Sequence, residues 1–492
     1  MQPGTATTAC ATPVPLAVDL DGTLIRTDLT WEALAGLLRT HPLALLAVPF
    51  WLLRGRAFLK QQLARRVRVD PAVLPYNQPF LDWLKEQKRA GRTLILATAS
   101  DTSLATPVAK YVGIFDDVLA SDGATNLRQR AKLAALTQRF GARGFDYAGN
   151  SAPDLAVWEG AREAVVVNAG AALTERAAQR AKIGRTFPST ALFWLPLLRA
   201  LRPHQWIKNL IVFVPALTAH RLGERPVVLA AARAFAAFCL CASAAYLVND
   251  LADLEADRHH ALKRRRPFAS GELPLAVGFI LAPLLLLVGL GLTLSLPASC
   301  TGVIAAYFIA ALIYSWRVKQ VPMLDVFFLA GLYTLRLAAG HTAARVIWSA
   351  WLLVFSMFIF LSLALVKRFQ ELRAARRANP EQRSAAPASQ VRGRGYMAAD
   401  MEVVTMLGIA SAFIAVLVLA LYVTSEQVLK LYAHPNLLLL ACPLLLYWLS
   451  RIWFLAHRGQ MDEDPTAFAI KDWVSYFIGG LTLLVLWLAT GF

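Results

Sequence analysis

NDLADLEAD, residues 249–257, follows directly on a long apolar run and spaces three aspartates at i, i+3 and i+7. On a helix, Asp250, Asp253 and Asp257 lie on one face, with Asn249 one turn before Asp253. Carboxylates arranged in this way repel each other and are costly at a membrane boundary. A divalent cation would offset both costs, and hard oxygen ligands favour Mg²⁺. The stretch therefore predicts a magnesium site at the end of a membrane helix, with a solvated helix end as the plainer alternative.

Cations follow the acidic stretch at once, in RHHALKRRRP at residues 258–267. A diphosphate leaving group needs positive charge around it, which a metal can supply on one side and Lys or Arg on the other. We expect Lys263, Arg264 and Arg266 to have this role. Read alone, the same run would be only a signal of membrane topology.

Composition assigns most of the chain to a membrane. Apolar residues make up 57% and charged residues 17% of 492, and the mean hydropathy is +0.48. The first ~190 residues are a globular mixture, and apolar runs follow that are long enough to span a bilayer. We predict about nine spans, near 206–220, 227–249, 274–296, 300–316, 322–341, 347–366, 402–424, 435–455 and 473–490.

Positive charge gathers in the connections after the second, fourth, sixth and eighth predicted spans. Lys and Arg mark the cytoplasmic side, so these connections and the N-terminal part are expected in the cytoplasm of a bacterial-type inner membrane. The net charge of +18 then reflects topology. Because basic and aromatic residues are not interleaved for base stacking, we expect no nucleic-acid partner.

NDxxDxxxD followed by KRxRP is similar to the motif of the UbiA superfamily of intramembrane prenyltransferases, and the resemblance covers residues 203–492. One branch, the decaprenyl-phosphate phosphoribosyltransferases, fits best. Its likeness is found in RPHQWIKN at 202–209, in YS at 314–315 with Lys319 and Asp325, in KRFQEL at 367–372, and from Asp464 to Asp472. The chain departs from the branch at Ala261, where a proline commonly precedes the lysine.

The resemblance implies transfer of phosphoribose from phosphoribosyl diphosphate (PRPP) to a polyprenyl phosphate, with release of pyrophosphate. It implies that Asn249, Asp250, Asp253 and Asp257 hold Mg²⁺ in an all-α membrane domain. Substrate binding is expected from Lys208, Asn249, Lys263, Arg264, Arg266, Tyr314, Lys319, Asp325, Lys367 and Arg368. Among these, Lys208 with Lys367 or Arg368 would anchor the lipid phosphate. A homo-oligomer is compatible with these features.

Two other interpretations stay open. Aromatic prenyltransferases of the superfamily usually have a second aspartate-rich motif after the fourth span, where this chain offers only Asp325. Transfer of a prenyl group from its diphosphate to an aromatic ring is the enzymatic alternative. A transporter regulated by its N-terminal domain is a third interpretation, although no inverted repeat of broken helices is visible.

The N-terminal part has a series of polar motifs at predicted strand ends. An apolar run at 15–18 leads into DLDGT at 19–23, and a second strand at 93–97 ends at Thr98. Lys132 opens a helical stretch, and FDYAGNSAPD at 145–154 is a third strand that ends in oxygen ligands. Paired carboxylates of this kind suit phosphoryl transfer, with one as nucleophile and the other as acid and base.

The order of these motifs resembles the haloacid dehalogenase (HAD) superfamily of phosphatases over residues 1–178. The resemblance implies a Rossmann-like α/β domain with a helical cap at about 28–90. Asp19 would be the nucleophile and Asp21 the acid/base, and Thr98 and Lys132 would bind phosphate. Mg²⁺ would be held by Asp19, Asp21, Asn150 and Asp154. Asn150 replaces the usual aspartate, so an active phosphatase with weaker metal binding and a retired domain both stay open.

Two further segments lie outside these motifs, and the first of them is ambiguous. Residues 42–53 are apolar but too short to span a bilayer, so they form either a buried cap helix or a segment at the membrane surface. Residues 179–202 are predicted as a basic linker.

Together the two domains would deliver a polyprenyl-phosphoryl ribose, because the HAD domain would remove the 5-phosphate from the product of the membrane domain.

Overall fold

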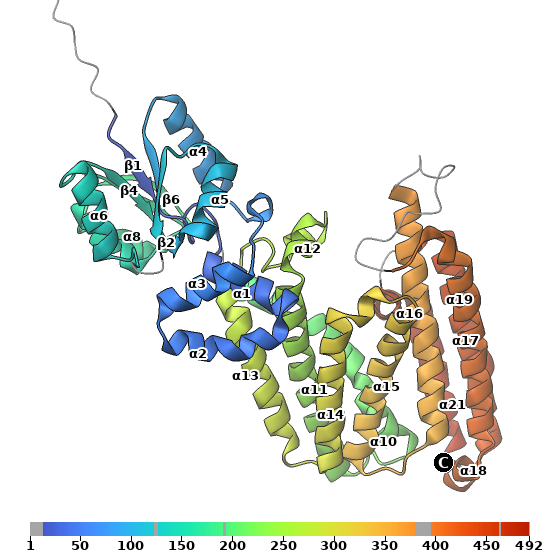
Figure 1. The fold of residues 1–492 in the computed structure, drawn as a ribbon. Coiled ribbons are helices and arrows are strands. Elements are labelled where there is room, and N and C mark those ends of the chain that lie inside the picture. The colour runs from blue at the N-terminus through green and yellow to red at the C-terminus, as the bar shows by residue number, and fades with distance from the viewer. Residues whose placement is uncertain (1–12, 123–125, 190–192, 379–394, 462–463, 492) are drawn as a thin grey trace, which may run out of the picture. The chain divides into compact units, whose positions relative to one another are not determined.

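The computed structural model describes residues 13–122, 126–189, 193–378, 395–461 and 464–491 (Figure 1). The chain divides into two compact units. The first ends at Leu201 and also includes Leu247–Leu281, and the second holds Arg202–Tyr246 and the chain from Ala282 onward. The stretch around Asp250 thus belongs to the same compact unit as the N-terminal domain.

A six-stranded sheet forms the centre of the first unit, with the order β3-β2-β1-β4-β5-β6 and only parallel pairings. The strands are β1 (Leu16–Val18), β2 (Leu94–Asp101), β3 (Asp117–Ser121), β4 (Asp146–Gly149), β5 (Ala164–Val167) and β6 (Ile183–Phe187). Side chains alternate between the faces: Leu16 and Val18 join one core cluster and Ala17 joins the other. Both faces are therefore covered, as a parallel sheet requires.

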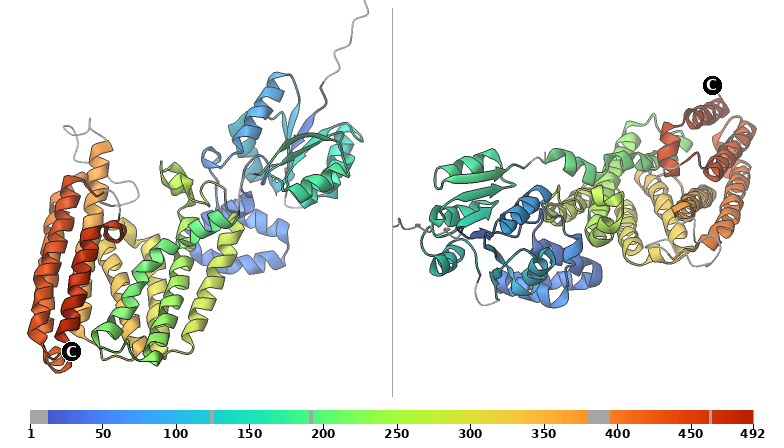
Figure 2. Two further views of the ribbon diagram at one scale, coloured as in Figure 1. Left: turned by 180° about the vertical axis from the view of Figure 1, so that it is seen from behind. Right: turned by 90° about the horizontal axis from the view of Figure 1, so that it is seen from above.

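Helices form a layer on each face of the sheet. The core on one side includes α4 (Gln78–Arg89) and α5 (Thr102–Val112). The core on the other side includes α6 (Arg130–Phe140), α7 (Leu155–Gly160) and α8 (Ala171–Ala178). Figure 2 shows the sheet between these layers from two further directions. The predicted α/β class is confirmed.

A helical insertion between β1 and β2 forms the cap. Its elements are α1 (Leu29–Thr40), η1 (Pro42–Ala47), α2 (Val48–Leu53), α3 (Arg56–Arg66) and η2 (Pro71–Val73). The first helix begins where Asp28 accepts a hydrogen bond from the Thr30 amide, which satisfies one of the free N–H groups of the first turn. The sheet also extends further than predicted, because β6 lies within the stretch expected to be a linker.

The remainder is helical. Its elements are α9 (Trp194–Leu201), η4 (Pro203–Phe213), α10 (Val214–Thr218), α11 (Arg225–Ala252), α12 (Leu254–His259), η5 (Lys263–Arg265), α13 (Leu275–Thr293), α14 (Ala298–Trp316), η6 (Val318–Gln320), α15 (Leu324–Ala344), α16 (Ala350–Ala378), η8 (Ala398–Asp400), α17 (Met401–Val423), α18 (Glu426–Leu431), η9 (Pro435–Leu440), α19 (Ala441–Arg458), α20 (Pro465–Lys471) and α21 (Trp473–Ala489).

Six helical segments of the described chain, and not the nine predicted, are long and apolar enough to cross a membrane. They are Arg225–Ala252, Leu275–Thr293, Ala298–Trp316, Ala350–Arg377, Ala398–Val423 and Pro435–Arg458. The other three predicted spans are helical but fall short for different reasons. The first is divided between η4 and α10, α15 contains Asp325, Arg336 and His341, and α21 has only 17 residues.

Candidate active sites

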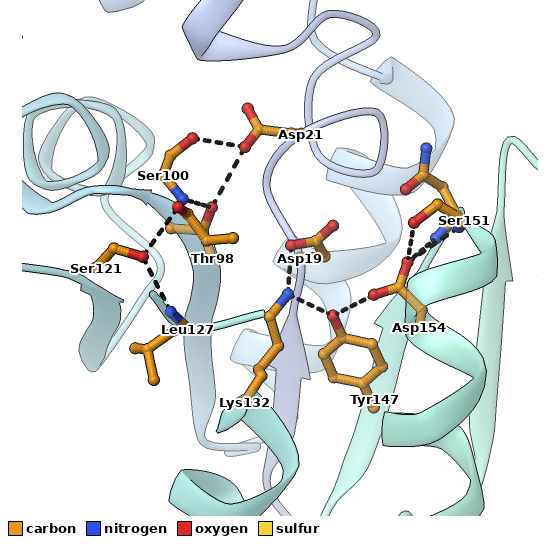
Figure 3. Close-up of polar contacts among 12 residues, drawn as sticks. Asp19, Asp21, Thr98, Ser100, Ser121, Leu127, Lys132, Tyr147, Ser151 and Asp154 are labelled. Carbon is orange, nitrogen blue, oxygen red and sulfur yellow. Dashed lines mark hydrogen bonds and ion pairs between the residues drawn. The ribbon is translucent and has the colours of Figure 1, made fainter. Parts of the chain in front are cut away.

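The carboxyl ends of β1, β2 and β4 meet at one edge of the sheet, and the polar motifs lie there (Figure 3). Asp19 follows β1 directly, and Gly22 turns the chain with a φ of +76°, a conformation that glycine adopts without strain. A Cβ at Gly22 would meet the Asn150 side-chain amide at 2.0 Å. Asn150 therefore lies against the loop that holds both aspartates.

A chain of hydrogen bonds joins Asp19 to β4. Lys132 donates from Nζ to Asp19 Oδ1 at 2.7 Å and contacts the Tyr147 hydroxyl at 2.7 Å. That hydroxyl donates to Asp154 Oδ1 at 2.8 Å. Burial raises the pKa of Asp19 to about 6, and the nearby Lys132 charge opposes the shift. The predicted phosphate-binding lysine thus contacts the predicted nucleophile.

Asp21 is held on both of its oxygens. Oδ1 accepts from the Leu29 amide at 2.8 Å, and Oδ2 accepts from the Ser100 hydroxyl at 2.6 Å and, at 3.5 Å, from Thr98. Burial raises its pKa to about 7, and the negative charges of Asp28 and Asp19 add to the shift. A carboxyl group that keeps its proton near neutral pH can act as a general acid.

Asp154 directs its oxygens to protein donors. Oδ2 accepts from the amides of Asn150 and Ser151 at 3.1 and 3.0 Å and from the Ser151 hydroxyl at 2.7 Å. With the Tyr147 hydroxyl on Oδ1, its role in this geometry is to fix the loop that presents Asn150. Its predicted role as a metal ligand stays a prediction.

Sequence reasoning missed three residues of this site. Ser100 bonds Asp21, and Tyr147 links Lys132 to Asp154. Lys60 of the cap donates to the Ala99 carbonyl at 2.6 Å and so brings a cation to the same edge. Side chains alternate along a strand, so Ser100 lies on the same side as Thr98. This signal can be used only once the strand is known to continue to Asp101. Lys60 lies 39 positions from its partner and gives no local signal.

Asp250 in the last turn of α11 and Asp257 in α12 form a second candidate site in the first unit. Arg266 donates from Nη1 to Asp250 Oδ1 at 3.0 Å and to Asp257 Oδ2 at 2.6 Å. Both carboxylates are buried. Burial raises the pKa of Asp257 to about 6, Arg266 lowers it and Asp250 raises it. The predicted shared face of Asp250 and Asp257 is thus formed.

Asp253 lies at the junction of α11 and α12, yet helical hydrogen bonding continues across it. Its amide donates to the Asn249 carbonyl at 2.9 Å, and its carbonyl accepts from the Asp257 amide at 2.8 Å. Lys263 and Arg264 are exposed in η5.

Among the residues that it describes, the structure gathers no set of three or more His, Cys, Asp or Glu that could hold a metal. Two buried carboxylates that share one arginine nevertheless have the oxygen chemistry that suits Mg²⁺.

Two lysines of the second unit converge on one carboxylate. Lys208 and Lys367 place their Nζ atoms 3.4 and 3.0 Å from Asp464 Oδ2. Lys208 also lies 5.9 Å from the centre of the Tyr333 ring. This arrangement brings together the two lysines predicted to anchor a lipid phosphate.

Arg368, also predicted to bind substrate, is engaged in a buried network of the second unit. Nε donates to Asp325 Oδ2 at 2.5 Å, Nη1 contacts Glu371, and Nη2 donates to the Tyr314 hydroxyl at 3.2 Å. Tyr396 donates to the other oxygen of Asp325 at 2.7 Å. Arg368 therefore links α14, α15 and α16. The remaining predicted residue of this unit, Lys319, is half-buried in η6.

Sequence reasoning also missed Arg336, which is buried in α15. It donates to Asn209 Oδ1 at 2.8 Å, to the Leu332 carbonyl at 2.7 Å and to the Tyr307 hydroxyl at 3.0 Å. A charged residue within an apolar helix was the available signal, because buried charges in membrane segments are rare and usually functional.

Two family models match the chain. The UbiA prenyltransferase family matches residues 210–478, and the haloacid dehalogenase-like hydrolase family matches residues 16–159. The uncharacterized protein y4nM of Sinorhizobium fredii is 38% identical over 471 residues, which cover 95% of this chain and 89% of that protein. Nodulation protein NoeC of Azorhizobium caulinodans is 35% identical over 295 residues, covering 59% of this chain and 90% of NoeC.

A third relative has a more specific name. The decaprenyl-phosphate phosphoribosyltransferase of Mycolicibacterium smegmatis is 40% identical over 185 residues, which cover 37% of this chain and 58% of that protein. The UbiA model spans more than half of the chain, and apolar helices of membrane-spanning length lie within the matched region. The chain is an integral membrane protein that belongs to the UbiA prenyltransferase family and has a haloacid dehalogenase-like domain N-terminal to it.

Proposed function

We propose that the membrane domain transfers 5-phosphoribosyl from PRPP to a polyprenyl phosphate and that the HAD domain then removes the 5-phosphate. The observation that supports this best is that one compact unit holds two buried clusters in which carboxylates contact a cation, the chemistry that a phosphate site requires. One consists of Asp19, Asp21 and Lys132, and the other of Asp250, Asp257 and Arg266. The similarity to a decaprenyl-phosphate phosphoribosyltransferase over part of the chain supports the choice of substrate class.

In the transfer step an oxygen of the lipid phosphate attacks C1 of the ribose, and the bond from C1 to the pyrophosphate oxygen breaks. Arg266 stabilises the charge that develops on pyrophosphate, because it is already oriented by Asp250 and Asp257. Lys263 and Arg264, exposed on the same loop, add positive charge. Lys208 and Lys367, which both contact Asp464, are the cations of the second unit that would bind the lipid phosphate in exchange for that carboxylate.

Mg²⁺ would bind Asp250 and Asp257 and would neutralise the pyrophosphate. Asn249 and Asp253 are proposed as further ligands, and Asp253 would have to turn toward the ion, because the described residues gather no cluster of three such side chains. In the HAD domain it would bind Asp19 and Asn150, and there it would orient the phosphate for attack. Asp19 attacks phosphorus while Asp21 gives its proton to the ribose oxygen that leaves. Water then attacks the phosphoenzyme, Asp21 accepts its proton, and inorganic phosphate is released.

The test is incubation of the purified chain with Mg²⁺, radiolabelled PRPP and decaprenyl phosphate, followed by mass analysis of the lipid fraction. Label in the lipid supports phosphoribosyl transfer, and the product's mass reports whether the 5-phosphate has been removed. Intact PRPP with folded protein would contradict the proposal. The same preparation with a polyprenyl diphosphate and an aromatic acceptor then tests ordinary prenyl transfer.

Asp19→Asn is expected to stop dephosphorylation and to leave transfer unchanged. Loss of a nucleophile lowers turnover by at least about 10³-fold, whereas the transfer site keeps all of its groups. Mass analysis should show the lipid product heavier by one phosphate. Asp82→Asn, which changes an exposed carboxylate of α4, is the matched control and should give the wild-type product. An unchanged product in Asp19→Asn would exclude the HAD step.

Asn150→Asp is expected to strengthen Mg²⁺ binding to the HAD domain. The substitution keeps the shape of the side chain that lies against Gly22 and adds a negative charge for a hard cation. The Mg²⁺ concentration for half-maximal hydrolysis of a soluble phosphate ester should fall by about tenfold. The Mg²⁺ concentration for half-maximal transfer should not change. An unchanged or higher value for hydrolysis would remove Asn150 from the metal site.

A further inference from the structure

The cap contains a stretch without a single polar side chain, PLALLAVPFWLL at residues 42–53. It forms η1 and α2, and both of its sides are apolar. Ala44, Leu45, Val48 and Trp51 pack against the core of the domain. A cap helix in water would have polar residues on its other side.

The outward side of this stretch is exposed and apolar. Leu43, Leu46, Phe50 and Leu53 are 81%, 73%, 69% and 86% exposed. Helix α4 of the same domain follows the ordinary rule, since it buries its apolar side chains and exposes polar ones. Contiguous exposed apolar surface of this kind marks a binding face.

Length and charge indicate what covers this face. Six 3-10 residues and six α-helical residues together reach about 21 Å, well short of the ~30 Å hydrocarbon core of a bilayer. The stretch is followed by Arg54 and Arg56, which are exposed. Apolar stretches of this length form either buried helices or segments at the membrane interface, and an exposed stretch followed by cations fits the interface, where the cations meet anionic head groups.

A contact within the first unit joins the cap to a candidate membrane span. The ring of Trp31 in α1 lies 5.5 Å from that of Phe279 in α13, centre to centre. Phe279 is four residues inside a helix that is long and apolar enough to cross the membrane, or about 6 Å along its axis. Interfacial helices bury their apolar face by about 5–10 Å. The helix that precedes the apolar stretch therefore contacts a candidate span close to the first residue of that span, which is compatible with a cap at the membrane surface.

We propose that residues 42–53 bind the boundary between lipid head groups and acyl chains, with Leu43, Leu46, Phe50 and Leu53 in the lipid. The HAD domain then acts at the bilayer surface, on a phosphate that belongs to a lipid-linked sugar. The second statement rests on the proposed function, whereas the membrane contact does not.

The test uses the full chain in nanodiscs of phosphatidylcholine and phosphatidylglycerol. Leu46→Cys is labelled with an environment-sensitive fluorophore in a background without the five native cysteines. Lipids brominated near the carbonyl end of their acyl chains should quench its fluorescence by about twofold or more, because the probe would lie at that depth. Arg176→Cys on exposed α8 is the matched control and should not be quenched.

Phe50→Cys repeats the measurement from the same face, so that one poorly folded variant does not decide the outcome. Absence of quenching at both positions, or equal quenching at Arg176→Cys, would overturn the membrane contact. Because the readout needs no substrate, it stands whether or not the chain proves to be a phosphatase.

The consequence for the HAD site is tested with Leu46→Glu combined with Phe50→Glu. Hydrolysis of the lipid-linked 5-phosphate should fall by about tenfold, since the active site loses its proximity to substrate in the membrane. Hydrolysis of a soluble phosphate ester should be unchanged. Equal loss on both substrates would overturn the positioning role.

Discussion

Asp250→Asn is expected to lower the rate of phosphoribosyl transfer by about 10²–10³-fold while leaving hydrolysis of a soluble phosphate ester intact. Asp250 and Asp257 share the Arg266 guanidinium, with oxygen-to-nitrogen distances of 3.0 and 2.6 Å. Loss of one buried carboxylate weakens the proposed metal site and releases one side of Arg266. Both changes act on the charge of the leaving pyrophosphate, which is greatest in the transition state.

The measurement is release of labelled pyrophosphate from PRPP over a range of Mg²⁺ concentrations. Glu255→Gln is the matched control, because Glu255 lies in the same acidic stretch but is exposed, and its variant should keep close to the wild-type rate. A wild-type rate in Asp250→Asn would place the transfer site elsewhere. A rate restored by excess Mg²⁺ would identify the loss as one of metal affinity.

Local sequence was sufficient for features that depend on neighbours along the chain. DLDGT indicated a strand end, and Asp19 follows β1 directly. Lys132 indicated a helix start, and α6 begins at Arg130. These predictions hold because a strand end and a tight turn are set by a few adjacent residues.

Features that depend on distant partners were less accessible. Arg368 was predicted to bind substrate, and the fold buries it against Asp325, 43 positions away. The first predicted span has the composition of a membrane helix, but the chain divides it between η4 and α10. Pro215 lies near the start of α10, where a proline interrupts the preceding hydrogen bonds. The Arg368 pairing depends on tertiary packing, which the hydrophobic periodicity does not indicate. The break at Pro215 had a local signal, but composition alone did not use it.

The ion pair of Glu32 and Arg258 is the clearest case of a long-range feature, because 226 positions separate its members. Arg258 donates to both carboxylate oxygens of Glu32, at 2.7 and 3.0 Å, and its Nε donates to the Ala269 carbonyl at 3.1 Å. Both side chains are buried, with exposures of 6% and 4%. The pair joins the cap helix that begins beside Asp21 to the helix that contains Asp257.

Glu32→Leu is expected to destabilise the first unit by about 3–5 kcal/mol, because it leaves the Arg258 charge buried without a partner. Adding Arg258→Met should recover most of that loss, since an apolar pair of similar volume removes the uncompensated charge. Pulse proteolysis of the full chain in detergent across a urea series gives the stability of each variant. Near-equal stability of Glu32→Leu and the wild type would contradict the prediction.

A second pair between the same two helices provides the matched control. Arg39 and Glu255 are 3.4 Å apart, with side chains 47% and 58% exposed. Water screens this pair, so Arg39→Met should cost no more than about 1 kcal/mol. A larger loss in Glu32→Leu than in Arg39→Met would show that burial of the pair, and not the mere presence of opposite charges, joins the cap to the aspartate-rich helix. Equal losses in the two variants would reduce the Glu32 pair to an ordinary surface contact.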